Sequence, residues 1–339
     1  MGNCFVSHEE LKTGCLSREK FDFERVIGKG GFGCVWEGKF LETNKKCAIK
    51  EIKKSLITSE NSIFVILNEL KILTNLNFSL LVNPIVAFQD KKCLYLVLDL
   101  KSGGDLRYNL IVQEKFSEAQ GKFFACCMVL TLEYLHSRNI LHRDIKPENL
   151  LLDSEGYLHL TDFGIACITK NGMCNDFSGT PGYMSPETVL KKPQSFASDF
   201  FSVGAVLYEV LLGRRPFESL DRKVIINQIQ NGEINFALKD FDGLSRNCID
   251  FIASLLVLNQ KKRLGRFGVD EVKSHLWFKG VDWDSIRNKT FRPPFKPQLL
   301  DNFSSFANMD LKYKRKVERV GNISNKLIGY FYVSPFAIK

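Results

Sequence analysis

The stretch HRDIKPEN at residues 142–149, followed by DFG at 162–164, decides the fold of this chain. Phosphoryl transfer is catalysed mostly by positioning and by neutralising charge on the equatorial oxygens, and this stretch supplies groups for both tasks. Asp144 can accept the hydrogen bond of an incoming hydroxyl, and Lys146 can offset charge on the transferring group. Asn149 and the aspartate of DFG offer the oxygen ligands that Mg²⁺ prefers. The two motifs therefore predict a phosphotransferase centre.

Length and composition set outer limits on the molecule. With 339 residues, of which 45% are hydrophobic, the chain can bury a large core, and we expect a two-lobed unit with extensions. The net charge is +9, but the basic residues are scattered among 38 acids and no nucleic-acid motif accompanies them, so a nucleic-acid partner is not expected. An anionic membrane or an acidic partner stays open. The ten cysteines show no metal-binding spacing and are typical of reduced thiols. Neither a transmembrane run nor a signal-peptide core is apparent.

A glycine-rich loop lies near the amino terminus. Residues 27–35 read IGKGGFGCV, a GxGxxGxV pattern that alone also fits a dinucleotide-binding fingerprint. Residues 35–40 alternate with period two and predict a strand, whereas a dinucleotide-binding loop opens a helix. No GK[ST] follows, which excludes a Walker-type loop. The glycines would let backbone N–H groups approach a phosphate without obstruction by a Cβ atom.

A lysine and a buried carboxylate follow this loop. Residues 47–50, CAIK, predict a strand that ends on Lys50, and residues 62–73 have the length and apolar period of a helix. Glu69 lies within the apolar stripe of that helix, where a carboxylate is poorly solvated unless a cation meets it. Glu60 is the alternative carboxylate, but we expect it to precede the helix in a polar stretch.

Together these motifs resemble those of protein kinases. The resemblance implies an α+β, bilobal fold, with a small β-rich amino lobe at about 21–100 and a larger helical carboxyl lobe at about 101–278. It implies ATP bound between the lobes with Mg²⁺, or Mn²⁺ as a substitute, and assigns catalytic roles to Asp144, Lys146 and the pair Lys50–Glu69. Asn149 and Asp162 become the implied metal ligands. The implied ATP contacts are Ile27, Gly28, Gly30, Gly33, Val35, Ala48, Lys50, Leu98, Asp99, Leu100, Asp105, Leu151 and Thr161.

Further motifs resemble one kinase group. Residues 179–187, GTPGYMSPE, are similar to the end of an activation loop, where Glu187 should pair with a buried Arg263. Lys146 and Thr180 are the choices of serine/threonine kinases. Residues 279–339 resemble the tail of the AGC group, relatives of protein kinase A, and in that resemblance Phe303 touches the nucleotide. Residues 80–82 and 103–108, together with the amino-terminal glycine, resemble the myristoylated YANK subfamily. The chain is expected to be a monomer.

Two regulatory positions of that group lack a hydroxyl here. The activation-loop phosphothreonine falls at Asp176, whose carboxylate could meet Arg143 in place of a phosphate, although a solvated loop acid is an equal alternative. Residues 327–332, LIGYFY, resemble the hydrophobic motif of the tail, with Phe331 at the hydroxyl position beside Tyr330. We therefore expect activity without phosphorylation at either position.

Three acids are implied to read the substrate. Asp105, Glu148 and Glu209 lie at positions that, in enzymes similar to protein kinase A, bind arginines two and three residues before the phosphoacceptor. The expected partners are proteins with basic residues near Ser or Thr, and the preference at −3 is better supported because Glu209 could be structural. Thr180 is the remaining implied substrate-site residue.

The amino-terminal MGNC resembles a dual acylation signal, with myristate on Gly2 and palmitate on Cys4. The sixth residue is valine where the pattern wants Ser or Thr, and an ordinary flexible leader over 1–20 is the alternative. Acylation would make the protein a peripheral membrane protein on the cytoplasmic face, and two anchors would be needed for stable attachment.

A catalytically inactive pseudokinase scaffold is the rival function. Its signature would be the loss of Lys50, Asp144, Asn149 or Asp162, and all four residues are present. The predicted reading is therefore an ATP- and Mg²⁺-dependent serine/threonine protein kinase with its domain at residues 21–278, between the leader and the tail.

Overall fold

The computed structural model describes residues 16–219, 221–232, 234, 241–298, 327 and 329–335. These residues form two compact units. The smaller unit contains residues 16–77, 82–102 and the described part of 327–335, and the larger contains 78–81 and 103–298. The smaller unit is mostly strands and the larger mostly helices, which confirms the predicted α+β class. Gly2, Cys4 and Phe303 lie outside the described residues.

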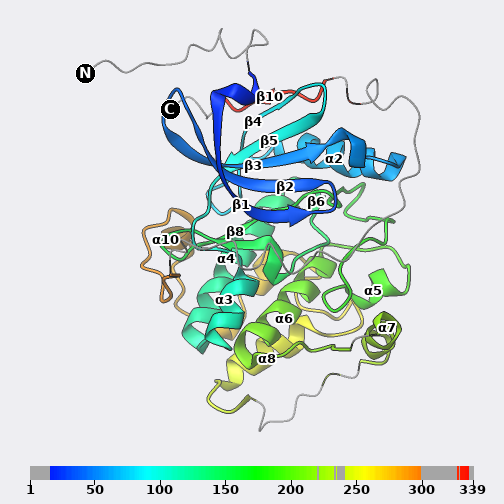
Figure 1. Cartoon of the computed structure of the whole chain (residues 1–339). Coiled ribbons are helices and arrows are strands. Elements are labelled where there is room, and N and C mark those ends of the chain that lie inside the picture. Colours follow the sequence, from blue (N-terminus) through cyan, green and yellow to red (C-terminus); the bar gives the residue numbers. More distant parts are fainter. Residues whose placement is uncertain are drawn as a thin grey trace. The chain divides into compact units, whose positions relative to one another are not determined.

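The smaller unit is built on an antiparallel sheet of order β1-β2-β3-β5-β4-β10 (Figure 1). Its alternating residues bury one face, where Phe21, Ile49 and Tyr95 belong to a core cluster. The strand predicted after the glycine loop is confirmed and begins at Gly33. The strands are β1 (Phe21–Gly30), β2 (Gly33–Phe40), β3 (Lys45–Lys53), β4 (Pro84–Gln89), β5 (Cys93–Asp99) and β10 (Tyr332–Val333).

Helix α2 (Glu60–Leu73) belongs to this unit. Ser59 caps it by accepting a hydrogen bond from the backbone N–H of Ser62 at 3.1 Å. The helix therefore begins two residues earlier than predicted, and Glu60 is its first residue rather than a residue before it. The expectation that Glu60 precedes the helix was wrong because the cap at Ser59 lies outside the apolar pattern from which the start was predicted.

The larger unit is organised around one buried helix. Helix α6 (Ala197–Leu212) is buried along almost its whole length, including its acids Asp199 and Glu209. It packs against α4 (Glu118–His136) and α8 (Arg246–Leu255). The other helices are α3 (Leu106–Gln113), α5 (Pro186–Val189), α7 (Arg222–Asn231), α9 (Val269–Lys273) and α10 (Trp283–Arg287).

Two short antiparallel strand pairs carry the motifs of the larger unit. Strand β6 (Ile140–Leu141) pairs with β9 (Cys167–Ile168), and β7 (Leu150–Leu152) pairs with β8 (Leu158–Leu160). The HRDIKPEN stretch joins β6 to β7, and DFG joins β8 to β9. The β7–β8 hairpin and the β6–β9 strand pair thus hold the chemically important loops side by side.

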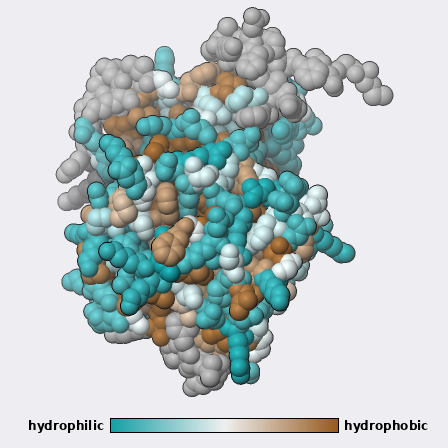
Figure 2. Space-filling view, turned by 180° about the vertical axis from the view of Figure 1, so that it is seen from behind, coloured by the Kyte–Doolittle hydropathy of each residue, from teal (hydrophilic) through white to brown (hydrophobic). Residues whose placement is uncertain are grey.

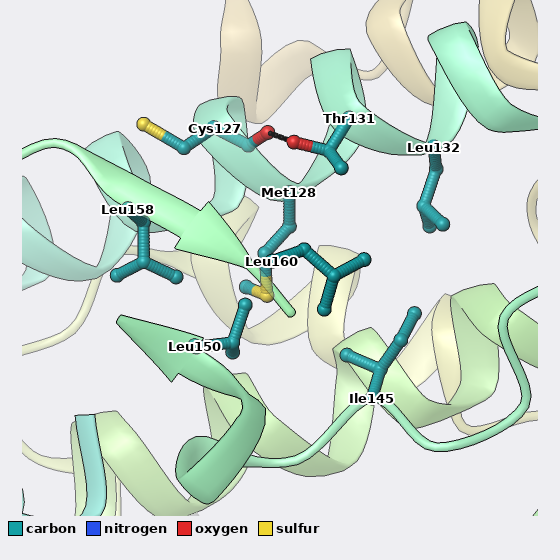
Figure 3. A pocket seen from close by; sticks show the side chains of 8 residues that line it. All are labelled: Cys127, Met128, Thr131, Leu132, Ile145, Leu150, Leu158 and Leu160. Carbon is teal, nitrogen blue, oxygen red and sulfur yellow. Dashed lines mark hydrogen bonds between the residues drawn. The ribbon is translucent and has the colours of Figure 1, made fainter. Parts of the chain in front are cut away.

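A small cavity lies between α4 and the β7–β8 hairpin (Figure 3). Its volume is about 10 Å³, which is at most the room for one water molecule. The side chain of Thr131 donates to the carbonyl oxygen of Cys127 at 2.8 Å, so the main polar group of the wall is already satisfied within the helix. The cavity is a packing defect of the core rather than a ligand site. It is lined by Cys127, Met128, Thr131, Leu132, Ile145, Leu150, Leu158 and Leu160.

The segment after α10 packs on the larger unit through aromatic rings. Phe291 stacks on Phe123 with ring centroids 5.6 Å apart, and Phe295 meets Phe116 edge-on at 5.0 Å. A Cβ atom on Gly156 would lie 1.9 Å from the carbonyl oxygen of Phe295, so only glycine permits this approach. The first part of the predicted tail therefore belongs to the larger unit.

The surface seen in Figure 2 shows hydrophobic residues as separate patches between hydrophilic ones. Among the helices of the described residues, none combines the length and apolarity that crossing a bilayer requires. All eight cysteines in the described part of the chain are free thiols. Burial raises the pKa of Cys47, Cys127 and Cys167 to about 12, whereas Cys34 is a partly exposed thiol of β2.

Candidate active site

A buried aspartate of α6 positions the catalytic loop. Both carboxylate oxygens of Asp199 accept backbone N–H groups, from His142 at 3.0 Å and from Arg143 at 2.9 Å. Burial opposes the charge on Asp199, but the hydrogen bond and charge of His136 lower its pKa below the ordinary value. Arg143 has φ of 70°, a left-handed conformation that a non-glycine residue keeps only when its surroundings impose it. The ionised Asp199 provides those surroundings.

The catalytic loop places the Asp144 carboxylate among three hydrogen-bond donors. Lys146 Nζ lies 2.7 Å from Asp144 Oδ2, and Thr180 Oγ1 donates to Asp144 Oδ1 at 2.6 Å. Asn149 Nδ2 donates to Asp144 Oδ2 at 3.0 Å, and Lys146 Nζ also reaches Thr180 Oγ1 at 2.9 Å. Both oxygens of the carboxylate are thereby fixed in direction. Asp144 is 8% exposed, so the group is partly desolvated yet reachable.

Two oxygen donors for a cation flank the β7–β8 hairpin: Asn149 directly precedes β7, and Asp162 follows β8. Asn149 uses its amide nitrogen to bond Asp144, which leaves its Oδ1 as the oxygen able to bind a metal. The N–H of Thr161 donates to the carbonyl oxygen of Asn149 at 3.0 Å, which brings Asp162 next to it. Asp162 has φ of 66°, a second left-handed residue.

This donor set offers oxygen atoms, the ligand type that suits Mg²⁺ and also Mn²⁺. Within the described ranges, no group of three or more His, Cys, Asp or Glu residues could hold a metal by itself. One carboxylate and one amide oxygen suit Mg²⁺, which usually keeps waters and binds substrate phosphates in addition to one or two protein carboxylates. The residues present therefore fit the implied ion.

In the smaller unit, Lys50 and Glu69 form an ion pair. Lys50 Nζ lies 2.7 Å from each carboxylate oxygen of Glu69, and the Glu69 side chain is 6% exposed. Val35 lies directly opposite Lys50, and Ala48 directly opposite Leu98, in neighbouring strands. Because facing residues share a side of the sheet and side chains alternate along a strand, these residues lie on one face.

The remaining predicted ATP contacts divide between the two units. Ile27, Gly28 and Gly30 lie on β1, and Gly33 begins β2 opposite Gly30. A Cβ atom on Gly33 would lie 1.8 Å from the carbonyl oxygen of Glu51, so glycine is required there. Asp99 ends β5, and Leu100 follows it. In the larger unit, Asp105 and Leu151 form an isolated bridge, and Thr161 follows β8.

Comparison with known proteins identifies the family of the chain. A family model described as the protein kinase domain matches residues 21–278. The chain belongs to the protein kinase family. Its relatives include serine/threonine-protein kinase sgk-1 of Caenorhabditis elegans, 39% identical over 88% of this chain and 64% of that protein. A probable serine/threonine-protein kinase of Dictyostelium discoideum is 38% identical over 88% of this chain and 66% of its own length.

The kinase also resembles serine/threonine-protein kinase YPK2/YKR2 of Saccharomyces cerevisiae, at 32% identity over 93% of this chain and 46% of the yeast protein. These relatives confirm the predicted AGC group. The chain spans between about half and two thirds of the length of the three relatives. Membership of the YANK subfamily stays a prediction.

In the activation segment of the kinase, Asp176 forms an ion pair with Arg143. Arg143 Nη2 lies 2.8 Å from Asp176 Oδ2, and Nη1 donates to the carbonyl oxygen of Asp176 at 2.8 Å. Ser178 Oγ donates to Asp176 Oδ1 at 2.9 Å. Partial burial works against the charge, but the bond and charge of Arg143 hold the pKa of Asp176 below its ordinary value. Asp176 therefore stays ionised and paired at neutral pH.

The end of the activation segment is fixed by the predicted pair of Glu187 and Arg263. Arg263 Nη1 and Nη2 lie 2.6 and 2.8 Å from the two carboxylate oxygens of Glu187. Arg263 is fully buried, and Ser198 Oγ donates to Glu187 at 2.6 Å. Burial raises the pKa of Glu187, but the Arg263 guanidinium outweighs it and leaves the pKa lowered. The predicted pair is confirmed.

Sequence reasoning missed the partner of the acids expected to read the substrate. Glu148 and Glu209 both bind Arg107, which lies within the subfamily-like stretch 103–108 but was assigned no role from the sequence. The only signal was a basic residue two positions after Asp105, and such residues are common on exposed helices. Asp105 itself caps α3 by accepting the N–H of Tyr108 at 2.7 Å. Burial, followed by the charge of Glu148, raises the pKa of Asp105.

The carboxyl-terminal motif lies on the smaller unit. Tyr332 of β10 pairs with Ala87 of β4, and Gln89 Nε2 donates to the carbonyl oxygen of Leu327 at 2.9 Å. Tyr330 is 1% exposed, and its pKa is raised by burial and by the charge of Glu69. Phe331, at the hydroxyl position, is 46% exposed. The buried aromatic of the motif is thus Tyr330.

Proposed function

We propose that this protein is a serine/threonine kinase that transfers the γ-phosphoryl group of ATP to hydroxyl groups of proteins. The observation that carries the proposal is the fixed Asp144, whose two oxygens receive Thr180, Lys146 and Asn149. A scaffold without catalytic activity would have no need for these three oriented donors. The ion pair of Lys50 with Glu69 gives independent support.

The chain's own groups account for the reaction. Asp144 is oriented to accept the proton of the substrate hydroxyl, and Lys146 stands beside it to offset charge on the transferring group. Asn149 and Asp162 would hold Mg²⁺, which supplies neutralisation of phosphate charge when bound. Glu69 orients Lys50, whose ammonium would meet the α- and β-phosphates.

The test is radiolabel transfer from Mg·ATP to Ser- and Thr-containing proteins or peptides, comparing the wild type with Asp144→Asn. The substitution keeps the shape but removes the base, so we expect a loss of at least about 100-fold in kcat. Asp250→Asn is the matched control, because Asp250 is 72% exposed and pairs with His275 on the surface. Equal activity of the wild type and Asp144→Asn, or ATP binding with no transfer at all, would favour the scaffold function.

We propose further that activity does not depend on phosphorylation of the activation loop or of the hydrophobic motif. The ion pair of Arg143 with Asp176 supports the first part, and Phe331, which has no hydroxyl, supports the second. Asp176 is half exposed, so its pair contributes modestly, and Asp176→Asn should lower kcat by no more than about fivefold. Recombinant protein shown by mass spectrometry to be unmodified should already transfer phosphate. Negligible activity of that protein would reject the proposal.

We propose a lipid anchor and a position on the cytoplasmic face of a membrane. The support is the amino-terminal MGNC, with Gly2 for myristate and Cys4 for palmitate. Because one acyl chain binds a membrane only marginally, Cys4→Ser should shift the protein to the soluble fraction and Gly2→Ala should abolish labelling by a myristate analogue. Absence of label on the wild type would contradict the anchor. We also propose that the protein is a monomer and that it belongs to the YANK subfamily.

A further inference from the structure

Arg107, on the first turn of α3, lies between two acids from distant parts of the larger unit. Its Nε donates to Glu148 Oε1 at 2.9 Å. Its Nη1 donates to Glu209 Oε1 at 2.7 Å, and its Nη2 donates to Glu209 Oε2 at 3.1 Å. The guanidinium therefore binds the Glu209 carboxylate in a bidentate manner. This is the forked geometry in which arginine binds a carboxylate most strongly.

Glu209 has little capacity left for another cation. Besides Arg107, it accepts from Arg215 Nε at 3.2 Å and from the hydroxyl of Tyr183 at 2.5 Å. Its side chain is only 5% exposed, because it extends from the buried helix α6. Burial works against the charge of Arg107, but the bonds and charges of its acidic partners raise its pKa, so the guanidinium stays charged. Glu209 is thus bound by two guanidinium groups of the same chain.

Glu148 is less constrained than Glu209. It makes one bond to Arg107, and 40% of its side chain is exposed. A carboxylate with that exposure retains lone pairs that an incoming guanidinium can reach. Glu148 and Glu209, which were expected to act alike on a substrate, therefore differ in their capacity to bind a further guanidinium group.

We propose that Arg107 is a built-in occupant of the guanidinium site at Glu209, so that the kinase does not select arginine two residues before the phosphoacceptor. A substrate arginine at that site would exchange one guanidinium for another, while its own side chain would lose rotamer freedom, so binding gains nothing. The positive charges of Arg107 and Arg215 also disfavour a third cation. Glu148 keeps an exposed carboxylate, and it stays available to a substrate arginine. The inference rests on the proposed kinase function and concerns only its specificity.

The experiment uses the full chain and four peptides that differ only in Arg or Ala at −3 and −2. For the wild type, kcat/KM should differ by less than about twofold between Arg and Ala at −2. Arg107→Met keeps an apolar stem but frees Glu209, and should raise that ratio to about tenfold or more. Adding Glu209→Gln to Arg107→Met should return the ratio to near one. Arg138→Met removes a guanidinium that lies over Tyr134 and serves as the matched control.

Arg107→Lys provides a second variant in case Arg107→Met folds poorly. It keeps one positive charge but loses the fork, so its ratio should lie between those of the wild type and Arg107→Met. Affinities of the same peptides, measured by fluorescence anisotropy, report the −2 ratio without catalysis. Absence of transfer to all four peptides would reject the kinase function, while the binding ratio would still decide the role of Arg107. A wild-type ratio of about ten or more that Arg107→Met leaves unchanged would overturn the inference.

Discussion

At the scale of single residues, His142 shows how a neutral side chain supports a charged site. It is completely buried, its Nδ1 accepts the backbone N–H of Asp144 at 3.3 Å, and its Nε2 lies 3.2 Å from the carbonyl oxygen of Thr161. Only the neutral tautomer with the proton on Nε2 satisfies both contacts. Burial lowers the pKa of His142, although the charges of Asp199 and other nearby acids oppose the shift.

This lowered pKa predicts a pH dependence of stability. As the pH falls below the ordinary value of 6.5, the unfolded chain binds a proton at His142 that the folded chain refuses. The contribution of neutral His142 to the free energy of unfolding is therefore complete above pH 6.5, and it declines as the pH falls from 6.5 to the lowered pKa. Denaturant unfolding at pH 7.5, 6.5 and 5.5 should show a steeper loss of the free energy of unfolding for the wild type than for His142→Gln. Equal slopes for the two proteins would count against a neutral His142.

At the scale of elements, the short strand β10 depends on one buried ring. Tyr330 is buried beside β10 while its neighbour Phe331 is exposed, so the two aromatic residues form a natural pair of test and control. Tyr330→Ala should lower the free energy of local opening of this segment by about 2–4 kcal/mol, because a large buried side chain is lost. Phe331→Ala should change it by less than about 0.5 kcal/mol. Hydrogen exchange of residues 332–334 measures both, and similar effects of the two substitutions would refute the assignment.

The elements also show how far sequence reasoning reaches. The strand after the glycine loop was predictable because side-chain alternation is local, and Glu69 because a carboxylate within an apolar stripe requires a cation. The start of α2 was placed wrongly because its cap at Ser59 lies outside that stripe. Arg107 was missed because its acids lie 41 and 102 residues away, and pairings at such separations leave no periodic signal.

At the scale of the whole molecule, the pair of Glu187 and Arg263 joins segments 76 residues apart inside the larger unit. Arg263→Ala would leave the buried carboxylate without its cation, and should lower the free energy of unfolding by about 3–5 kcal/mol. Arg266→Ala is the matched control. Its pair with Glu271 is partly exposed and should contribute less than about 1 kcal/mol.

The two units call for a probe that reports on one of them. Of the three tryptophans, Trp36 lies in the smaller unit and Trp277 and Trp283 lie in the larger. In a Trp36→Phe background, tryptophan fluorescence therefore follows unfolding of the larger unit alone, which avoids assuming a single transition for both units. If Arg263→Ala and Arg266→Ala shift that transition equally, the buried pair does not have the predicted effect.

The cysteine thiols differ in pKa and exposure, and this difference permits selective labelling of one of them. Alkylating reagents attack the thiolate, and the raised pKa values of Cys47 and Cys127 leave almost no thiolate on them at pH 7.5. Cys34, beside Gly33 at the start of β2, is partly exposed. In a Cys4→Ser, Cys15→Ser background, a maleimide dye should attach chiefly at Cys34 and report on nucleotide near the glycine loop without an engineered cysteine.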